Sequence, residues 1–156
     1  MANFVIDTNV GICANGRDTH ASLRCQLACS DFLETCRTLH ITLDNQNLIM
    51  SEYEKHFYHK GEPGMGDAFF KYLYHNQHAG DKIQLVEITP INEEKTEFAE
   101  LPKNQVDPSD RKFLATAVVA KAILVNATDS DWTEQKNLLE TLQIEVKQLC
   151  PEHSCK

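Results

Sequence analysis

Phe4-Val5-Ile6-Asp7-Thr8-Asn9 is the stretch that decides the fold, because a short apolar run ends there in three polar residues. Consecutive large apolar side chains indicate a strand that is buried on both faces, as in the centre of a parallel sheet. Such a strand brings the residue that follows it, Asp7, to the sheet edge where ligands bind in parallel folds. We expect Thr8 and Asn9 to continue from the strand as a polar loop.

The rest of the chain alternates between helix-like and strand-like stretches. Apolar residues at helical spacing predict helices, and short runs rich in β-branched residues predict strands. The expected helices cover residues 20–37, 48–58, 65–76, 91–99, 107–120 and 133–142, and the expected strands cover residues 39–43, 83–88, 122–127 and 144–146. Strands that alternate with helices predict a three-layer α/β/α sandwich around a mainly parallel sheet of about four or five strands.

The length of 156 residues suits one domain, which we place at residues 1–149, with a tail at residues 150–156. The sequence has no apolar run of membrane-spanning length and no signal peptide at its start, so we expect a cytoplasmic protein. Its six cysteines should then be reduced. The tail, Cys150-Pro151-Glu152-His153-Ser154-Cys155, offers three zinc ligands at best, and we expect it to be frayed rather than metal-bound.

Several acidic residues follow predicted strands or begin predicted helices, and we expect their side chains to meet at one edge of the sheet. They are Asp7, Glu52, Asp110, Asp129 and Asp131. Carboxylates brought together repel one another and raise one another's pKa unless a cation lies between them. Oxygen ligands of this kind favour Mg²⁺ or Mn²⁺ over zinc. A site of this type suits the hydrolysis of phosphodiesters.

Four stretches of the chain resemble, in order, the acidic motifs of PIN-domain nucleases. They are Phe4–Val10, Ser51–Tyr53, Asp110–Ala117 and Thr128–Trp132. Each motif is weak alone, but the ordered set spans nearly the whole chain. The resemblance implies an endoribonuclease of the bacterial, toxin-like kind that uses Mg²⁺ or Mn²⁺. Its attacking nucleophile would be water, and its products would carry a 5′-phosphate and a 3′-hydroxyl.

The resemblance also implies roles for individual residues. Metal-binding and catalytic roles fall to Asp7, Glu52, Asp110 and Asp129, with Asp131 as a secondary metal-binding acid, and Thr8 and Asn9 would line the site. The neighbouring cations Arg111 and Lys112 are candidates for holding substrate phosphates, although an exposed basic pair in a first helical turn needs no such role. The implied partners are an RNA substrate, a second copy of the chain and an antitoxin or other regulatory protein.

Alternatives remain open at this stage. Glu54 and Asp44 compete with Glu52 for the second acidic position, and Asp107 is better explained as a helix N-cap. The rival function is a catalytically silent PIN-like module that binds RNA or protein. A haloacid-dehalogenase-type phosphatase needs a second aspartate where this chain has Asn9, and a receiver-like domain needs an acidic pair that is missing. The net charge of −8 is unusual for a protein that meets nucleic acid.

Overall fold

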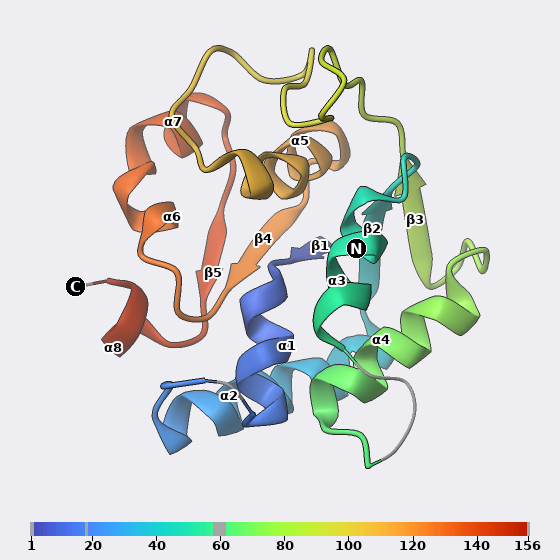
Figure 1. Cartoon of the computed structure of the whole chain (residues 1–156), viewed down its shortest axis with the longest axis vertical. Coiled ribbons are helices and arrows are strands. Elements are labelled where there is room, and N and C mark those ends of the chain that lie inside the picture. The colour runs from blue at the N-terminus through green and yellow to red at the C-terminus, as the bar shows by residue number, and fades with distance from the viewer. Residues whose placement is uncertain (1, 18, 58–61, 156) are drawn as a thin grey trace.

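In a computed structural model that describes residues 2–17, 19–57 and 62–155, the chain folds around one sheet of five parallel strands in the order β3-β2-β1-β4-β5 (Figure 1). The strands are β1 (Asn3–Ile6), β2 (His40–Asp44), β3 (Ile83–Val86), β4 (Ile123–Asn126) and β5 (Val146–Gln148). The α-helices are α1 (Thr8–Asn15), α2 (Leu23–Thr35), α3 (Leu48–His56), α4 (Met65–Asn76), α5 (Arg111–Ala120), α6 (Asp131–Glu134), α7 (Lys136–Thr141) and α8 (Pro151–Ser154), and the 3₁₀ helices are η1 (Cys36–Thr38) and η2 (Pro108–Asp110). The predicted α/β/α sandwich is confirmed.

Helices cover both faces of the sheet. α1, α2 and α4 pack on one another on one side, and α5 packs against β1, β2 and β4 on the other (Figure 1). The strands between these layers are apolar, and Val5, Ile41 and Leu124 are fully buried. Within the described residues, none of the helices is both long and apolar enough to cross a membrane.

β1 is buried, as its apolar sequence predicted, and it lies in the centre of the sheet. Phe4 lies in register with Ile41 of β2 on one side and with Ile123 of β4 on the other. The backbone N–H of Asp7 donates to the carbonyl of Val125 at 3.0 Å, so the ladder continues one residue beyond the strand. The carboxyl end of the central strand thereby fixes the backbone of the first candidate site residue.

The polar loop expected after β1 is instead the helix α1. Asp7 is its N-cap, with a side-chain oxygen that accepts from the N–H of Asn9 at 3.4 Å. Gly16 ends the helix in the left-handed conformation, with φ of 72°, which glycine adopts without strain. Sequence patterning missed this helix because its eight residues carry no clear apolar stripe.

Three other predicted helices differ in the structure. Residues 91–99 were expected to be helical, but Pro90 and Phe98 form an antiparallel bridge, and the side chain of Asn92 accepts the N–H groups of Thr96 and Glu97. The helix expected over residues 133–142 is divided into α6 and α7 at Gln135. The helix expected over residues 48–58 is described to His56, and residue 58 lies outside the described residues.

The C-terminal segment is tied down, which corrects the expectation of a frayed tail with only reduced cysteines. Cys150 forms a disulfide with Cys25 of α2, and both residues are fully buried. Ser154 of α8 is also buried, and its hydroxyl donates to the side-chain oxygen of Gln148 at 2.8 Å. The prediction failed because cysteine spacing along the chain does not show which cysteines meet in space.

Close packing between α1 and α4 gives a first prediction. A Cβ atom added at Gly66 would lie 2.2 Å from the backbone oxygen of Gly11, and backbone cannot move aside cheaply. Gly66→Ala should therefore lower the free energy of unfolding by about 1–3 kcal/mol. Urea denaturation measures this change. Gly80→Ala is the matched control, since nothing lies within 4 Å of its added Cβ, and equal stability of the two variants would contradict the packing described.

Candidate metal centre

Asp7, Asp110 and Asp129 converge at the carboxyl edge of the sheet. Each offers one carboxylate oxygen, and these oxygens all lie within 4.8 Å of one another. Asp7 follows β1, Asp129 follows β4, and Asp110 ends η2 immediately before α5. The three acids line a cleft of about 380 Å³ whose walls include Thr8, Glu52, His56, Ser109, Phe113 and Thr128. Asp7 therefore shares one small polar space with two residues that lie more than a hundred positions away in the sequence.

Asp7 is the buried member of the three. The indole Nε1 of Trp132 donates to its Oδ2 at 2.7 Å, which orients the carboxylate. Burial raises the pKa of Asp7 to about 6, although the Trp132 hydrogen bond opposes the shift. The nearby charge of Asp129 adds to the increase. Asp7 thus lies in a setting that disfavours its charged form unless a positive charge is near.

Asp110 and Asp129 show the same tendency. Burial, followed by the charges of Asp7 and Asp129, raises the pKa of Asp110 to about 8. Burial also raises the pKa of Asp129, whose Oδ1 accepts the backbone N–H of Asp131 at 2.8 Å. The pKa values of all three residues are raised, as expected for clustered acids, with burial as the largest cause. Other members of the group contribute to the increase at Asp7 and Asp110, whereas Asp131 contributes at Asp129.

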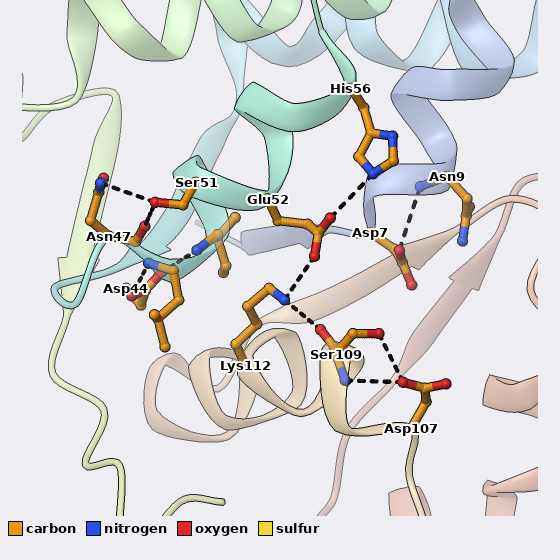
Figure 2. Close-up of polar contacts among 12 residues, drawn as sticks. Asp7, Asn9, Asp44, Asn47, Ser51, Glu52, His56, Asp107, Ser109 and Lys112 are labelled. Carbon is orange, nitrogen blue, oxygen red and sulfur yellow. Dashed lines mark hydrogen bonds and ion pairs between the residues drawn. The ribbon is translucent and has the colours of Figure 1, made fainter. Parts of the chain in front are cut away.

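Glu52 lies on the same cleft but is paired with cations of the chain itself (Figure 2). Its Oε1 accepts from Lys112 Nζ at 3.0 Å, and its Oε2 lies 3.2 Å from His56 Nε2. Burial alone would raise the pKa of Glu52, but the hydrogen bond and charge of Lys112 outweigh it, so the pKa is lowered. Glu52 therefore differs from the three aspartates, since its charge is already balanced.

The alternatives to Glu52 have other surroundings. Asp44 accepts backbone N–H groups from Gln46, Leu48 and Ile49, each at 2.9 Å, so its carboxylate is committed to the start of α3. Glu54 is exposed on α3. Asp107 caps η2 by accepting the N–H of Ser109 at 3.0 Å, as the sequence predicted. These contacts leave Glu52 as the second-motif acid that faces the cleft.

Asp131 begins α6, two residues after Asp129. Its backbone N–H holds the Asp129 carboxylate, as described above, and its side-chain oxygens are not part of the close group formed by Asp7, Asp110 and Asp129 within the described residues. The structure thus gives Asp131 a supporting position through its backbone. A direct metal-binding role for its side chain remains a prediction.

The four predicted substrate-binding residues are divided between two environments. Thr8 and Asn9 line the cleft, and the Asn9 side chain also fastens α1 to the end of β4 by accepting the N–H of Ala127 at 2.8 Å. Lys112 lies at the wall of the cleft, where its Nζ donates to Glu52 and, at 2.5 Å, to the carbonyl of Ser109 (Figure 2). Arg111 instead donates to the carbonyls of Val106 at 2.9 Å and Thr96 at 3.4 Å. The guanidinium therefore braces the loop before η2 and borders a different cavity.

The donor set fits a hard divalent cation. Three carboxylates supply oxygen ligands, and burial together with neighbouring acids raises their pKa values, an effect that a bound cation would oppose. Thr8 adds an independent observation, since its Oγ1 is buried and has no hydrogen-bond partner among the described residues. Buried hydroxyls are nearly always paired, so a partner such as water or an ion in the cleft would complete it.

Two contributors to the site escaped the sequence analysis. Trp132 was given no role in the site by the sequence, yet its indole donates a side-chain hydrogen bond to Asp7. His56 was not assigned to the site, yet it contacts Glu52 one helical turn away. The i,i+4 spacing of His56 and Glu52 was a usable signal, whereas nothing in the sequence indicated that the Trp132 indole would reach β1.

Comparisons of this chain with protein-family models, with curated proteins and with solved structures found no match. The geometry and chemistry of the site are therefore what indicates a function.

Proposed function

We propose that this protein is a Mg²⁺- or Mn²⁺-dependent endoribonuclease of the PIN-domain type. The observation that carries the proposal is the group of Asp7, Asp110 and Asp129, whose carboxylate oxygens lie within 4.8 Å of one another at the carboxyl edge of a parallel sheet. The order of acidic motifs along the chain supports the same assignment. In this proposal the reaction is hydrolysis of an RNA phosphodiester, in which water adds to phosphorus and the bond to the 3′-oxygen breaks.

In this proposal the three aspartates hold the cation, which would supply the positive charge that activates water and stabilises the developing charge on phosphate. Trp132 orients the Asp7 carboxylate through its 2.7 Å hydrogen bond, and the N–H of Asp131 does the same for Asp129 at 2.8 Å. Both contacts reduce the freedom of the ligands before any ion arrives.

Lys112 and Glu52 form the second part of the proposed site. Lys112 Nζ lies against Glu52 at the wall of the cleft, where only 13% of the lysine side chain is exposed. A substrate phosphate that entered the cleft would compete with Glu52 for this ammonium group. We assign to Lys112 the role of binding a phosphate and to Glu52 the role of holding Lys112 in place, with direct metal binding by Glu52 as the alternative.

The proposal includes the location and partners of a PIN-type nuclease. The substrate is RNA, the compartment is the cytoplasm, and a second copy of the chain and an antitoxin or other regulatory protein are the proposed protein partners. The net charge of −8 favours a regulator with a basic surface over an acidic one.

Metal dependence is the direct test. Purified protein incubated with labelled single-stranded RNA should cleave it in Mn²⁺ or Mg²⁺, stop on addition of EDTA and recover when the cation is restored in excess. The products should carry 5′-phosphates, which a 5′-phosphate-dependent exonuclease would then degrade. Cleavage that continues in EDTA would reject the proposal. Cation binding without cleavage would instead identify the silent binding module.

A further inference from the structure

A second group of potential ligands lies behind α1, and it consists of sulfur atoms. Cys13 comes from α1, Cys25 and Cys29 lie one turn apart on α2, and Cys150 precedes α8. All four residues are buried, with at most 1% of any of them exposed. Four cysteines from three separate parts of the chain therefore meet in one enclosed place.

The distances between these sulfur atoms are close to those of a metal-thiolate site. The Sγ atoms of Cys13, Cys25 and Cys29 all lie within 4.8 Å of one another. Cys150 Sγ lies 3.9 Å from Cys29 Sγ and is bonded to Cys25 Sγ. In a tetrahedral zinc site with Zn–S bonds of about 2.3 Å, neighbouring sulfurs are about 3.8 Å apart. To reach that geometry the bonded pair must separate, and Cys150 Sγ must also approach Cys13 Sγ, because Cys150 is not part of the close group of Cys13, Cys25 and Cys29.

We propose that, when the Cys25–Cys150 disulfide is reduced, Cys13, Cys25, Cys29 and Cys150 bind one Zn²⁺ as a tetrahedral thiolate site. A dithiol reduces the disulfide by giving it two electrons and two protons and itself becomes a disulfide, whereas a phosphine does so with one water molecule and becomes a phosphine oxide. Either reaction yields two thiols. Zn²⁺ binding then releases the protons of the four thiols to water. The disulfide and the zinc site are thus alternative states of the same four sulfurs.

The surroundings favour zinc over a hard cation. Sulfur ligands select zinc, whereas the oxygen ligands of the cleft select Mg²⁺ or Mn²⁺. Cys25 is the third residue of α2, a helix of 13 residues, so the positive end of the helix dipole favours a thiolate there. The Thr19 hydroxyl lies 3.7 Å from Cys13 Sγ and can donate to it. These features partly offset the negative charge that four thiolates retain around a divalent ion.

A competing ligand set includes the tail. One ligand atom each of Cys25, Glu152 and His153 also lie within 4.8 Å of one another. However, His153 Nε2 accepts the backbone N–H of Ser22 at 3.0 Å, and Glu152 accepts the Ser22 hydroxyl at 3.3 Å. These two side chains already cap the start of α2, so we assign the metal to the four cysteines.

Cobalt titration tests the assignment. Protein reduced with a phosphine under nitrogen and freed of metal should develop, on addition of Co²⁺, the intense sulfur-to-cobalt charge-transfer bands of a tetrahedral thiolate complex, and these bands should correspond to one Co²⁺ per chain. Zn²⁺ should remove these bands. Oxidised protein should not develop them, and this comparison needs no variant. Co²⁺ at the carboxylate cleft has oxygen ligands and gives no such bands.

Variants identify the ligands. Because loss of a supporting group already weakens metal affinity by about 10–100-fold, Cys29→Ser should weaken Co²⁺ binding by at least about 100-fold. Cys36→Ser is the matched control, since Cys36 is an equally buried free cysteine outside the cluster. Circular dichroism of the reduced, metal-free variants checks that they are folded. Absence of thiolate bands in reduced wild type, unchanged binding by Cys29→Ser, or loss of the bands in His153→Ala would each overturn the proposal.

Discussion

Asp110→Asn should reduce Mn²⁺-dependent RNA cleavage by about 10²–10³-fold or more, while the protein remains folded. The substitution keeps the shape of the side chain but removes a charge from the group formed with Asp7 and Asp129. Asp7→Asn should have an effect of similar size, because its amide oxygen can still accept the indole N–H of Trp132. Initial cleavage rates at saturating Mn²⁺ measure both effects.

Asp107→Asn is the matched control for these variants. It removes a negative charge three residues from Asp110, but asparagine caps helices as well as aspartate does, so η2 should remain intact. Cleavage by this variant should equal that of the wild type. If Asp7→Asn and Asp110→Asn each cleaved RNA as fast as the wild type, the acidic group would take no part in the reaction. A loss of cleavage seen only in Glu52→Gln would assign metal binding to Glu52 instead of the three aspartates.

The stability of the metal-free protein should fall as pH rises from about 4 to about 8. The pKa of Asp110 is raised from 3.8 to about 8 in the folded protein, so over this range the folded chain holds a proton that the unfolded chain has released. Unfolding therefore becomes easier as pH increases. Asp7, with its pKa raised to about 6, adds to the loss at the lower end of the range. A bound divalent cation would replace these protons and reverse the trend.

Thermal unfolding with and without Mg²⁺ measures this linkage. The increase in Tm caused by Mg²⁺ should be larger near pH 8 than near pH 5. Without cation, Asp110→Asn should unfold about 2–4 °C above wild type near pH 8, which corresponds to about 1 kcal/mol after allowance for the partial exposure of this carboxyl. The difference between the two proteins should vanish near pH 4. An equal Mg²⁺ effect at all pH values would contradict the raised pKa values.

Much of this architecture was predictable because local patterns and the global fold agree. The apolar run before Asp7 marked a buried strand, and the Asp107-Pro108 pair marked the start of the segment that carries Asp110. Since the carboxyl ends of parallel strands share one edge, these markers were enough to predict that Asp7, Asp110 and Asp129 would meet. The same proximity led to the prediction that their pKa values are higher than those of ordinary aspartates.

The features that escaped prediction depend on contacts between distant segments. The Cys25–Cys150 disulfide joins residues 125 positions apart, and the indole of Trp132 crosses to Asp7 over the same sequence separation. Arg111 looked like a phosphate ligand beside Lys112, but neighbours on a helix point in different directions, and backbone carbonyls of the preceding loop hold its guanidinium. Sequence spacing cannot report such partners.

β1 precedes the other four strands in the chain, yet it lies in the middle of the sheet between β2 and β4. While a ribosome is still making the polypeptide, one edge of β1 therefore stays unpaired until β4 has emerged. Asp7 acquires the Val125 carbonyl, Asp129 and Trp132 as neighbours only at that point. The acidic group is therefore complete only after β4 and the turn behind it have been synthesised. A nascent chain that ends before β4 lacks Asp129 and Trp132 and so has no complete site.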